Sequence, residues 1–439
     1  MKLKAGISKV NITPPVGIPQ AGFAARTDVS RGILDDLFVK VLVLDDTRIK
    51  IAIITCDLIG LSKDIVKEIR QLIEKKTNIN GNKVMIACSH THSGPVINDP
   101  GYLEEKLIKA ILPEWAKILP YKIAGAVEIA ANTLIDARLG IARGYSDIGV
   151  NRRLRTKEGN IVIGPNFQGM TDPTVGVLRV DRMNGFPLAV LVNYACHAVT
   201  LGPENLFFSA DYPGYMMNML EKLWNNKTIV MFANGPAGNI NPRIRGNYKA
   251  TRKIGSMLAG EVLKIIETME TDSHISLNMV RKSIYLPLKK FPSLAQAKAY
   301  LKEKEQELLK EDTSRLQGEI IRAKHKIRVI EELQRLEKEK DLKANRISTE
   351  IQALRINNSA FISLPGEIFA EIGLAIKRRS PFEQTFVIGY ANDYISYVPT
   401  TESYIEGGYE PDWAIVDRGA DKVMEYEGVA LLERCKTSG

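Results

Sequence analysis

The sequence predicts an α/β fold of layered mixed β-sheet, with a helical hairpin inserted over residues 293–350. Two separate stretches each follow a strand, helix, strand order, which is typical of α/β layers. A later stretch changes to Lys, Glu, Arg, Gln and Leu with helical spacing. Of the 439 residues, 45% are hydrophobic and 25% charged, an ordinary globular balance. We therefore expect one folded domain over residues 1–439.

The first α/β unit lies before residue 90. Residues 37–44 and 49–54 are rich in β-branched side chains and flank a short polar turn, so they predict two adjacent strands, joined as a hairpin. Ser62 can then cap a helix whose apolar residues share one face, namely Ile65, Ile69, Leu72 and Ile73. Val84 to Cys88 supplies the next strand.

The second unit repeats this order. Residues 175–180 and 188–192 predict strands on either side of Asn184-Gly185, a dipeptide favoured in type I′ hairpin turns. A helix over residues 215–224 leads into a strand over residues 229–233. Ligands commonly bind where the strands of open α/β sheets end, so residues that follow these strands are candidates for function.

The charged stretch, residues 293–350, predicts a helical hairpin with a break at Glu311 to Ser314. Two interpretations stay open: a protruding or dimer-forming element, or a solvated pair of packing helices. Strand-like sequence resumes at residues 351–356 and 360–364.

Charge and hydropathy limit the classes of function. The 60 Lys and Arg exceed the 51 Asp and Glu, but the basic residues are scattered, which favours a solvated surface and no nucleic-acid role. The first residues lack an export signal, and no stretch is apolar enough to predict a membrane span. The cysteines at 56, 88, 196 and 435 are far apart, so we expect a cytoplasmic protein with free thiols.

Three of the five histidines fall in two short motifs at strand ends. His90 and His92 are two residues apart, so on an extended backbone their side chains would project from one face toward one ion. Such a pair alone is more often polar surface or a hydrogen-bonded core pair, but Gly94-Pro95 makes a turn that would hold it rigidly. His197 follows another apolar strand, where a lone histidine is usually a hydrogen-bonded core residue. Together these motifs suggest one metal site, for which zinc is a candidate.

Further candidates lie near the end of the chain. Leu364-Pro365-Gly366-Glu367 places an acid directly after a strand, and residues 390–409 bring together Tyr394, Tyr397, Tyr404 and Tyr409. Taken singly, Glu367 would be an acid that starts a helix, and the tyrosines would be packing residues.

These stretches, taken together, resemble the neutral/alkaline non-lysosomal ceramidases over nearly the whole chain. The matching segments occur in the family's order and cover residues 87–95, 149–152, 193–201, 209–215, 234–243, 366–367 and 392–409. The resemblance implies an α/β catalytic domain with zinc at the base of its pocket. It also implies cleavage of the N-acyl amide of ceramide to sphingosine and fatty acid, and so a role in sphingolipid metabolism.

Carried over residue by residue, the resemblance implies that zinc is held by His90, His197, Glu367 and Tyr397. His92 is then a neighbouring acid–base group, Tyr409 the phenol that stabilises the oxyanion, and Arg152 an arginine that lines the site. Asp211 matches a motif position, and we expect it, with Asn241, near the substrate. A zinc-activated water would attack the amide carbonyl.

The chain departs from the family at two places. Where the family carries a serine proposed as catalytic, this chain has Asn241, which cannot be a nucleophile. The chain also ends soon after Tyr409, so we expect a short microbial form without the family's immunoglobulin-like domain. These departures leave two alternatives, a hydrolase of esters or small non-lipid amides and a zinc-retaining binding protein without activity.

Overall fold

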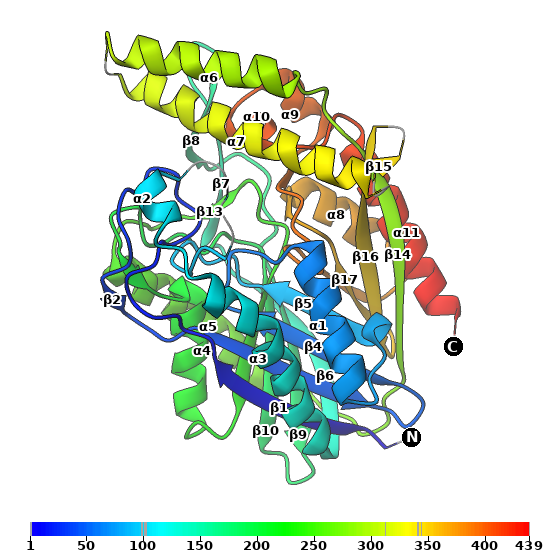
Figure 1. Cartoon of the computed structure of the whole chain (residues 1–439). Coiled ribbons are helices and arrows are strands. Elements are labelled where there is room, and N and C mark those ends of the chain that lie inside the picture. The colour runs from blue at the N-terminus through cyan, green and yellow to red at the C-terminus, as the bar shows by residue number, and fades with distance from the viewer. Residues whose placement is uncertain are drawn as a thin grey trace.

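The computed structural model describes residues 2–97, 100, 103–311, 313–339, 342–343 and 345–438. Its largest sheet is mixed and has eight strands (Figure 1). Their order is β12 (Ile229–Asn234), β10 (Pro187–Tyr194), β9 (Thr174–Arg182), β6 (Ile135–Tyr145), β1 (Lys4–Asn11), β3 (Phe38–Asp45), β4 (Lys50–Cys56) and β5 (Val84–Cys88). A smaller sheet contains β14 (Leu277–Pro287), β16 (Arg346–Ile356), β17 (Ser359–Ser363) and β19 (Gln384–Ile388), with β15 (Leu342–Lys343) beside β16.

Alternating side chains on the strands build the layers. On β3, Val39, Val41 and Val43 pack into a core shared with helices, whereas Leu42 and Leu44 face a second core shared with the smaller sheet. The helices on the first core are α1 (Lys63–Lys76), α3 (Pro113–Asn132), α4 (Asp211–Leu223) and α5 (Tyr248–Thr268). The other face of the smaller sheet is covered by α8 (Ala370–Arg379) and α11 (Ala420–Thr437). The predicted layered α/β class is confirmed.

The large sheet bends between its two halves. β1 and β6 are paired over only Lys4↔Asp136 and Ala5↔Ile135, whereas β1 and β3 are paired over their whole length. Because of this bend, the two edge strands β12 and β5 lie close together. The side chain of Asn234 joins them, since its Nδ2 donates to the Ser89 carbonyl at 3.1 Å. The segments that follow β5, β10 and β12 therefore meet at one place.

Short elements surround this meeting point. They are β2 (Gly32–Ile33) with β11 (Phe207–Phe208), the sheet of β13 (Ile240–Pro242), β7 (Gly149–Arg155) and β8 (Ile161–Asn166), the pair β18 (Glu367–Ile368) and β20 (Tyr397–Val398), and the helices η1 (Gly81–Lys83), α2 (Glu105–Ile108), α9 (Thr401–Glu406) and α10 (Tyr409–Trp413). The ends of the long strands thus carry the loops that build the site.

Two local predictions differ from the structure in detail. Ser62 precedes α1 as predicted, but its side chain makes no capping bond; the carboxylate of Asp393 instead accepts from the Lys63 backbone N–H at 3.0 Å. Of Asn184-Gly185, only Gly185 has a positive φ (83°). This excludes the predicted type I′ turn, which needs a positive φ at both positions.

The inserted segment contains two helices, α6 (Leu294–Leu308) and α7 (Ser314–Lys338), which lie side by side (Figure 1). The predicted break is present, although its Asp312 lies outside the described residues. The predicted boundary at residue 350 is wrong, because residues 346–350 belong to β16 and pair with β14. Within the described ranges, no helix is both long and apolar enough to cross a bilayer.

Candidate active site

The His90–His92 segment begins directly after β5. Its backbone is not extended as predicted, because His90 has a φ of 61°, in the left-handed region. Backbone bonds from His90 N to Leu58 O (3.0 Å) and from His92 N to Ala198 O (3.2 Å) hold this conformation. The His90 ring stacks on the Tyr390 ring with a centroid distance of 4.0 Å. The turn brings the two imidazoles together, with their Nε2 atoms 3.2 Å apart.

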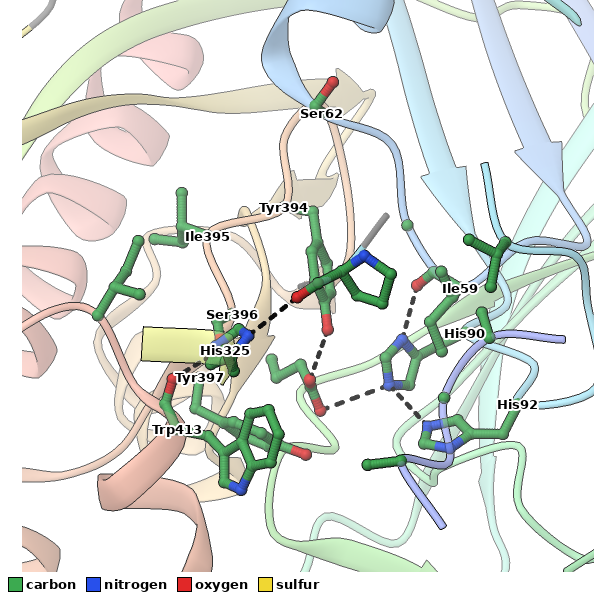
Figure 2. Close-up of a pocket in the computed structure, with 18 of the residues that line it drawn as sticks. Ile59, Ser62, His90, His92, His325, Tyr394, Ile395, Ser396, Tyr397 and Trp413 are labelled. Carbon is green, nitrogen blue, oxygen red and sulfur yellow. Dashed lines mark hydrogen bonds and ion pairs between the residues drawn. The ribbon is translucent and has the colours of Figure 1, made fainter. Parts of the chain in front are cut away.

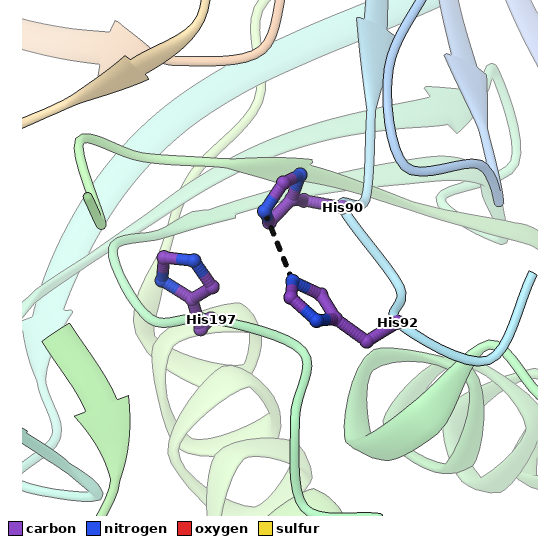
Figure 3. Close-up of side chains that lie close together, drawn as sticks. All are labelled: His90, His92 and His197. Atoms are coloured by element: carbon purple, nitrogen blue, oxygen red, sulfur yellow. Dashed lines mark hydrogen bonds between the residues drawn. The ribbon is translucent and has the colours of Figure 1, made fainter. Parts of the chain in front are cut away.

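His197 reaches the same point from the end of β10. A bridge between Thr91 and Ala198 joins the two histidine segments. The Nδ1 of His197 lies 2.6 Å from the Ala237 carbonyl, and that of His90 lies 2.7 Å from the Ile59 carbonyl. These carbonyls are acceptors, so each Nδ1 carries a proton, and Nε2 is the ring atom that can bind a metal ion. Figure 3 shows the three rings converging.

Glu367 enters from the smaller sheet. Gly366 precedes it with a φ of 86°, and a Cβ there would lie 2.4 Å from the Ser396 carbonyl oxygen, so glycine is required. In the parallel β18–β20 pair, Glu367 is in register with Tyr397, which places these two predicted ligands side by side. The Glu367 Oε2 lies 3.0 Å from His197 Nε2 and 3.4 Å from His90 Nε2. Glu367 is therefore a member of the histidine cluster and not simply an acid that starts α8.

Burial and charge fix the protonation of this cluster. Burial and the nearby Arg152 lower the pKa of His197 to about 4. Burial, with the rings of His90 and His197, also lowers the pKa of His92 well below its usual value. Burial alone would raise the pKa of Glu367, but the His90 and His197 rings bring it well below its usual value. At neutral pH His92 and His197 are therefore neutral imidazoles and Glu367 is a carboxylate, the forms that bind metal ions.

The cluster fits a small divalent cation. The ligand atoms of His90, His92 and His197 lie within 4.8 Å of one another. Two atoms that each lie about 2.0–2.1 Å from a tetrahedral Zn²⁺ are about 3.3–3.4 Å apart. The distances from Glu367 Oε2 to the two Nε2 atoms, 3.0 and 3.4 Å, bracket that value. The carbonyls that accept from the Nδ1 atoms supply the second shell usual for metal-binding histidines.

The buried guanidinium of Arg152 connects Tyr397 to Glu410, His197 and Asn241. Nη2 of Arg152 donates to the Tyr397 hydroxyl at 2.9 Å, and Nε donates to Glu410 at 2.8 Å. Nη1 lies 3.3 Å from His197 Nε2 and 3.4 Å from the Asn241 amide oxygen. Burial raises the pKa of the Tyr397 phenol well above its usual value although Arg152 favours the phenolate. A further positive charge is therefore needed to ionise this phenol at neutral pH.

A cavity of about 360 Å³ opens beside the cluster, and its lining is mostly apolar. Five of the predicted site residues line it, namely His90, His92, Glu367, Tyr397 and Tyr409. Figure 2 shows His90 and His92 on one side of this cavity, with Trp413 and His325 on the opposite side. The cavity thus offers a bound molecule an apolar surface that ends at the polar cluster.

The other predicted residues lie outside the lining. His197 belongs to the cluster but does not line the cavity, Arg152 contacts His197, and Asn241 accepts from Arg152. Asp211 is also absent from the lining and does not take the position near substrate that we expected. Its buried carboxylate instead accepts from the backbone N–H groups of Thr200 and Leu201, at 3.1 and 3.0 Å. It therefore supports the loop that follows His197.

Sequence reasoning missed several residues that complete the site. The Tyr394 hydroxyl donates to Glu367 Oε1 at 2.7 Å, although the pattern indicated only a packing residue. Glu410 holds both Arg152 and Arg153 at 2.8 Å. Gly22, with a φ of 97°, passes so close to His92 that a Cβ would lie 2.4 Å from its ring. The Tyr-Glu pair at 409–410 was the one visible signal for Glu410; the other two positions carry no motif by themselves.

Comparisons with known proteins show which family this chain resembles in sequence. A family model described as neutral/alkaline non-lysosomal ceramidase, N-terminal, matches residues 3–262. Neutral ceramidase from Drosophila pseudoobscura pseudoobscura is 25% identical over 266 residues, covering 55% of this chain and 36% of that protein. Neutral ceramidase from Drosophila melanogaster is 26% identical over 263 residues, with the same coverage. The match therefore spans little more than a third of the length of these curated relatives.

Solved structures extend the similarity of fold over the whole chain. Neutral ceramidase from Pseudomonas aeruginosa aligns with a TM-score of 0.73 at 20% identity, covering 99% of this chain and 75% of that one. A structure described as ceramidase complexed with C2 also aligns with a TM-score of 0.73, at 18% identity, covering 100% of this chain and 77% of that one. The similarity includes the region beyond residue 262, where Glu367, Tyr397 and Tyr409 lie.

Proposed function

Because this chain belongs to the neutral/alkaline non-lysosomal ceramidase family, we propose that it is a zinc-dependent amidohydrolase that cleaves an N-acyl bond. The observation that carries the proposal is the convergence of His90, His197 and Glu367 beside one mostly apolar cavity. Neutral imidazoles and a carboxylate suit Zn²⁺, and an apolar cavity suits an acyl group.

In this proposal His90, His197, Glu367 and Tyr397 hold the metal. The Nδ1 contacts of both histidines with backbone carbonyls favour this role, and so does the register that sets Glu367 beside Tyr397. When bound, Zn²⁺ supplies a Lewis acid and lowers the pKa of water from about 16 to about 7. The Arg152 guanidinium, itself held by Glu410, keeps the Tyr397 oxygen directed toward the centre.

The remaining residues act on the substrate. His92 lines the cavity and is neutral at pH 7, so its ring can accept a proton from water and pass it to the leaving nitrogen. Tyr409 lines the same cavity, and its hydroxyl is the group that would donate to the oxyanion that develops on the carbonyl oxygen. Asn241 accepts from Arg152 and takes no covalent part, so the mechanism involves no acyl-enzyme on this residue.

One experiment tests metal and chemistry together. The purified protein is analysed for bound metal and is then assayed on N-acyl amides graded in chain length and headgroup, with matched esters alongside. We expect one zinc per chain and turnover of amides. Turnover of esters only would favour the alternative hydrolase, and bound zinc without turnover of any substrate would favour a binding protein. His197→Ala should lose both zinc and turnover, and full activity in this variant would disprove the proposal.

A further inference from the structure

The inserted hairpin forms part of the candidate site. Two residues of α7, His325 and Val329, line the 360 Å³ cavity beside the histidine cluster, and so do Trp413 and Ile415. The same four residues line a second cavity of about 330 Å³ on the hairpin side. They therefore form a wall between the two spaces, which we call the partition (His325, Val329, Trp413 and Ile415).

Contacts on several sides hold the partition in place. The His325 and Trp413 rings lie 4.5 Å apart between centroids, and the Trp413 ring lies 5.6 Å from that of Tyr409. His325 Nδ1 lies 3.3 Å from the Pro100 carbonyl oxygen. Farther along α7, Arg335 forms a 3.0 Å ion pair with Asp64 at the start of α1. The helix is thus attached to both sides of the cavity that it helps to close.

The two spaces differ in chemistry. Beside the histidines the lining is mostly apolar and includes Ile59, Ile65, Val96 and Ile97. On the hairpin side the lining includes the charged side chains of Glu319, Arg322, Lys326 and Asp412. Transfer of an alkyl chain from water into the first cavity is favourable. Transfer into the second is unfavourable, because charged groups there would be desolvated.

We propose that the partition ends the acyl-binding arm of the site and restricts the enzyme to short and medium acyl groups. This inference rests on the proposed amidase function and adds the class of substrate. The cavity of about 360 Å³ is near the lower end of the range for small-molecule sites, about 300–1,000 Å³.

The proposal predicts a break in the dependence of kcat/KM on acyl-chain length, which is the length beyond which further carbons no longer raise kcat/KM. Each methylene group that enters the apolar arm should raise kcat/KM about fourfold, from the usual free energy of burial. The gain should stop at the chain length that meets the partition, because further carbons find no apolar surface there. Val329→Ala should move the break one or two carbons longer, and Val329→Phe should move it shorter. Ile330→Ala is the matched control, because Ile330 is the next residue of α7, is buried and lines neither cavity.

The test measures both turnover and binding with zinc-loaded protein. Amides with acyl chains from two to sixteen carbons give kcat/KM, and the matching straight-chain carboxylates give dissociation constants by calorimetry. The proposal is supported if the break moves in the two Val329 variants and stays in Ile330→Ala. It is overturned if Val329→Ala follows the wild-type profile, if Ile330→Ala moves the break equally, or if no carboxylate binds. If no amide is turned over, but the dissociation constants of the carboxylates show a break that moves in the Val329 variants, the amidase function is refuted and the role of the partition is retained.

Discussion

His92 differs from the other two histidines of the cluster in what holds its ring. His90 and His197 each direct Nδ1 at a backbone carbonyl, whereas the Nδ1 of His92 is buried with no hydrogen-bond partner among the described residues. Metal-binding histidines usually donate their other ring N–H to such an acceptor. The environment of His92 therefore favours an acid–base role over ligation, although its Nε2 lies close enough to ligate.

This difference predicts opposite outcomes for two alanine variants. His197→Ala should lose zinc and turnover together, because it removes a ligand. His92→Ala should keep zinc and lose about 10²–10⁴-fold in kcat, the usual contribution of a general acid or base. Metal content by mass spectrometry, measured beside kcat, separates the two roles. If His92→Ala also loses its zinc, the ligand set contains all three histidines and Tyr397 need not be a ligand.

Tyr394 orients Glu367 through the bond from its hydroxyl to Oε1. Because such partners fix the direction of a ligand, Tyr394→Phe should weaken zinc binding about 10–100-fold while the fold is retained. Competition with a fluorescent chelator measures the change. Tyr404→Phe is the matched control, since its hydroxyl donates to the Val416 carbonyl at 2.6 Å and not to Glu367. Equal zinc affinities in the two variants would show that Tyr394 does not position the ligand.

At the scale of elements, a buried acid from the segment after β19, Asp393, caps the start of α1. Burial raises the pKa of Asp393 to about 6. The folded protein therefore keeps a proton that the unfolded chain loses near pH 4, so the free energy of unfolding falls as the pH rises from about 4 to about 6. The loss from this group is at most about 3 kcal/mol.

Asp393→Asn should remove most of this dependence, because the amide copies the protonated acid and its oxygen can still accept from Lys63 N–H. Urea unfolding at pH 4.5 and pH 7.5 tests this. The variant should lose less stability between the two values than the wild type does. Glu68→Gln removes an exposed acid of α1, the helix that Asp393 caps, and should leave the wild-type dependence unchanged. A dependence in Asp393→Asn as steep as in the wild type would contradict the prediction.

The hairpin of α6 and α7 joins two strands that are already neighbours. Pro287 of β14 pairs with Arg346 of β16, and the Leu288 N–H donates to the Asn345 carbonyl at 3.0 Å. A short turn that contains glycine can therefore replace residues 290–343 without moving either strand. The shortened protein should fold, bind zinc and lose its break in acyl-chain dependence. Circular dichroism and zinc content check the fold, and a chain that fails to fold would show that the hairpin belongs to the core.

How far the sequence predicts these elements depends on the range of the interactions that form them. The strands over residues 37–54 and helix α1 follow local periodicity, and the structure confirms them. Residues 346–350 were predicted as helical hairpin because their composition is polar, but pairing with distant β14 makes them strand. His325 was missed because one inward residue on a charged helix leaves no pattern. Whether the hairpin also joins two copies of the chain stays a prediction, and so does the cytoplasmic location.

At the scale of the whole molecule, the candidate site joins the two sheets. His90 and His197 follow strands of the large sheet, whereas Glu367 follows β17 of the smaller one. Their meeting depends on the bend that brings β12 near β5, and no local pattern in the sequence predicts that bend. The sequence could therefore suggest a metal from the His-x-His pair, but only the resemblance to a family supplied Glu367 and Tyr397 as ligands.

A metal that bridges the sheets should stabilise the entire fold. An ion that binds only the folded state, at a hundred times its Kd, adds about 2.7 kcal/mol to the free energy of unfolding. Chelation should therefore lower Tm in calorimetry, and added Zn²⁺ should restore it. His197→Ala should show no response to either treatment, whereas His92→Ala should respond as the wild type does. An unchanged Tm after complete removal of the metal would place the ion outside the structural core.

The four proposed ligands, His90, His197, Glu367 and Tyr397, are spread along the chain. Their order in the sequence determines when the site can form during biosynthesis. A ribosome must release nearly all of the polypeptide before Glu367 and Tyr397 can join the two histidines. Until then the nascent chain lacks two of the four proposed ligands. With the proposed ligand set, metal loading is a late event in maturation, and a translation product that ends before Glu367 should bind zinc more weakly than the whole chain.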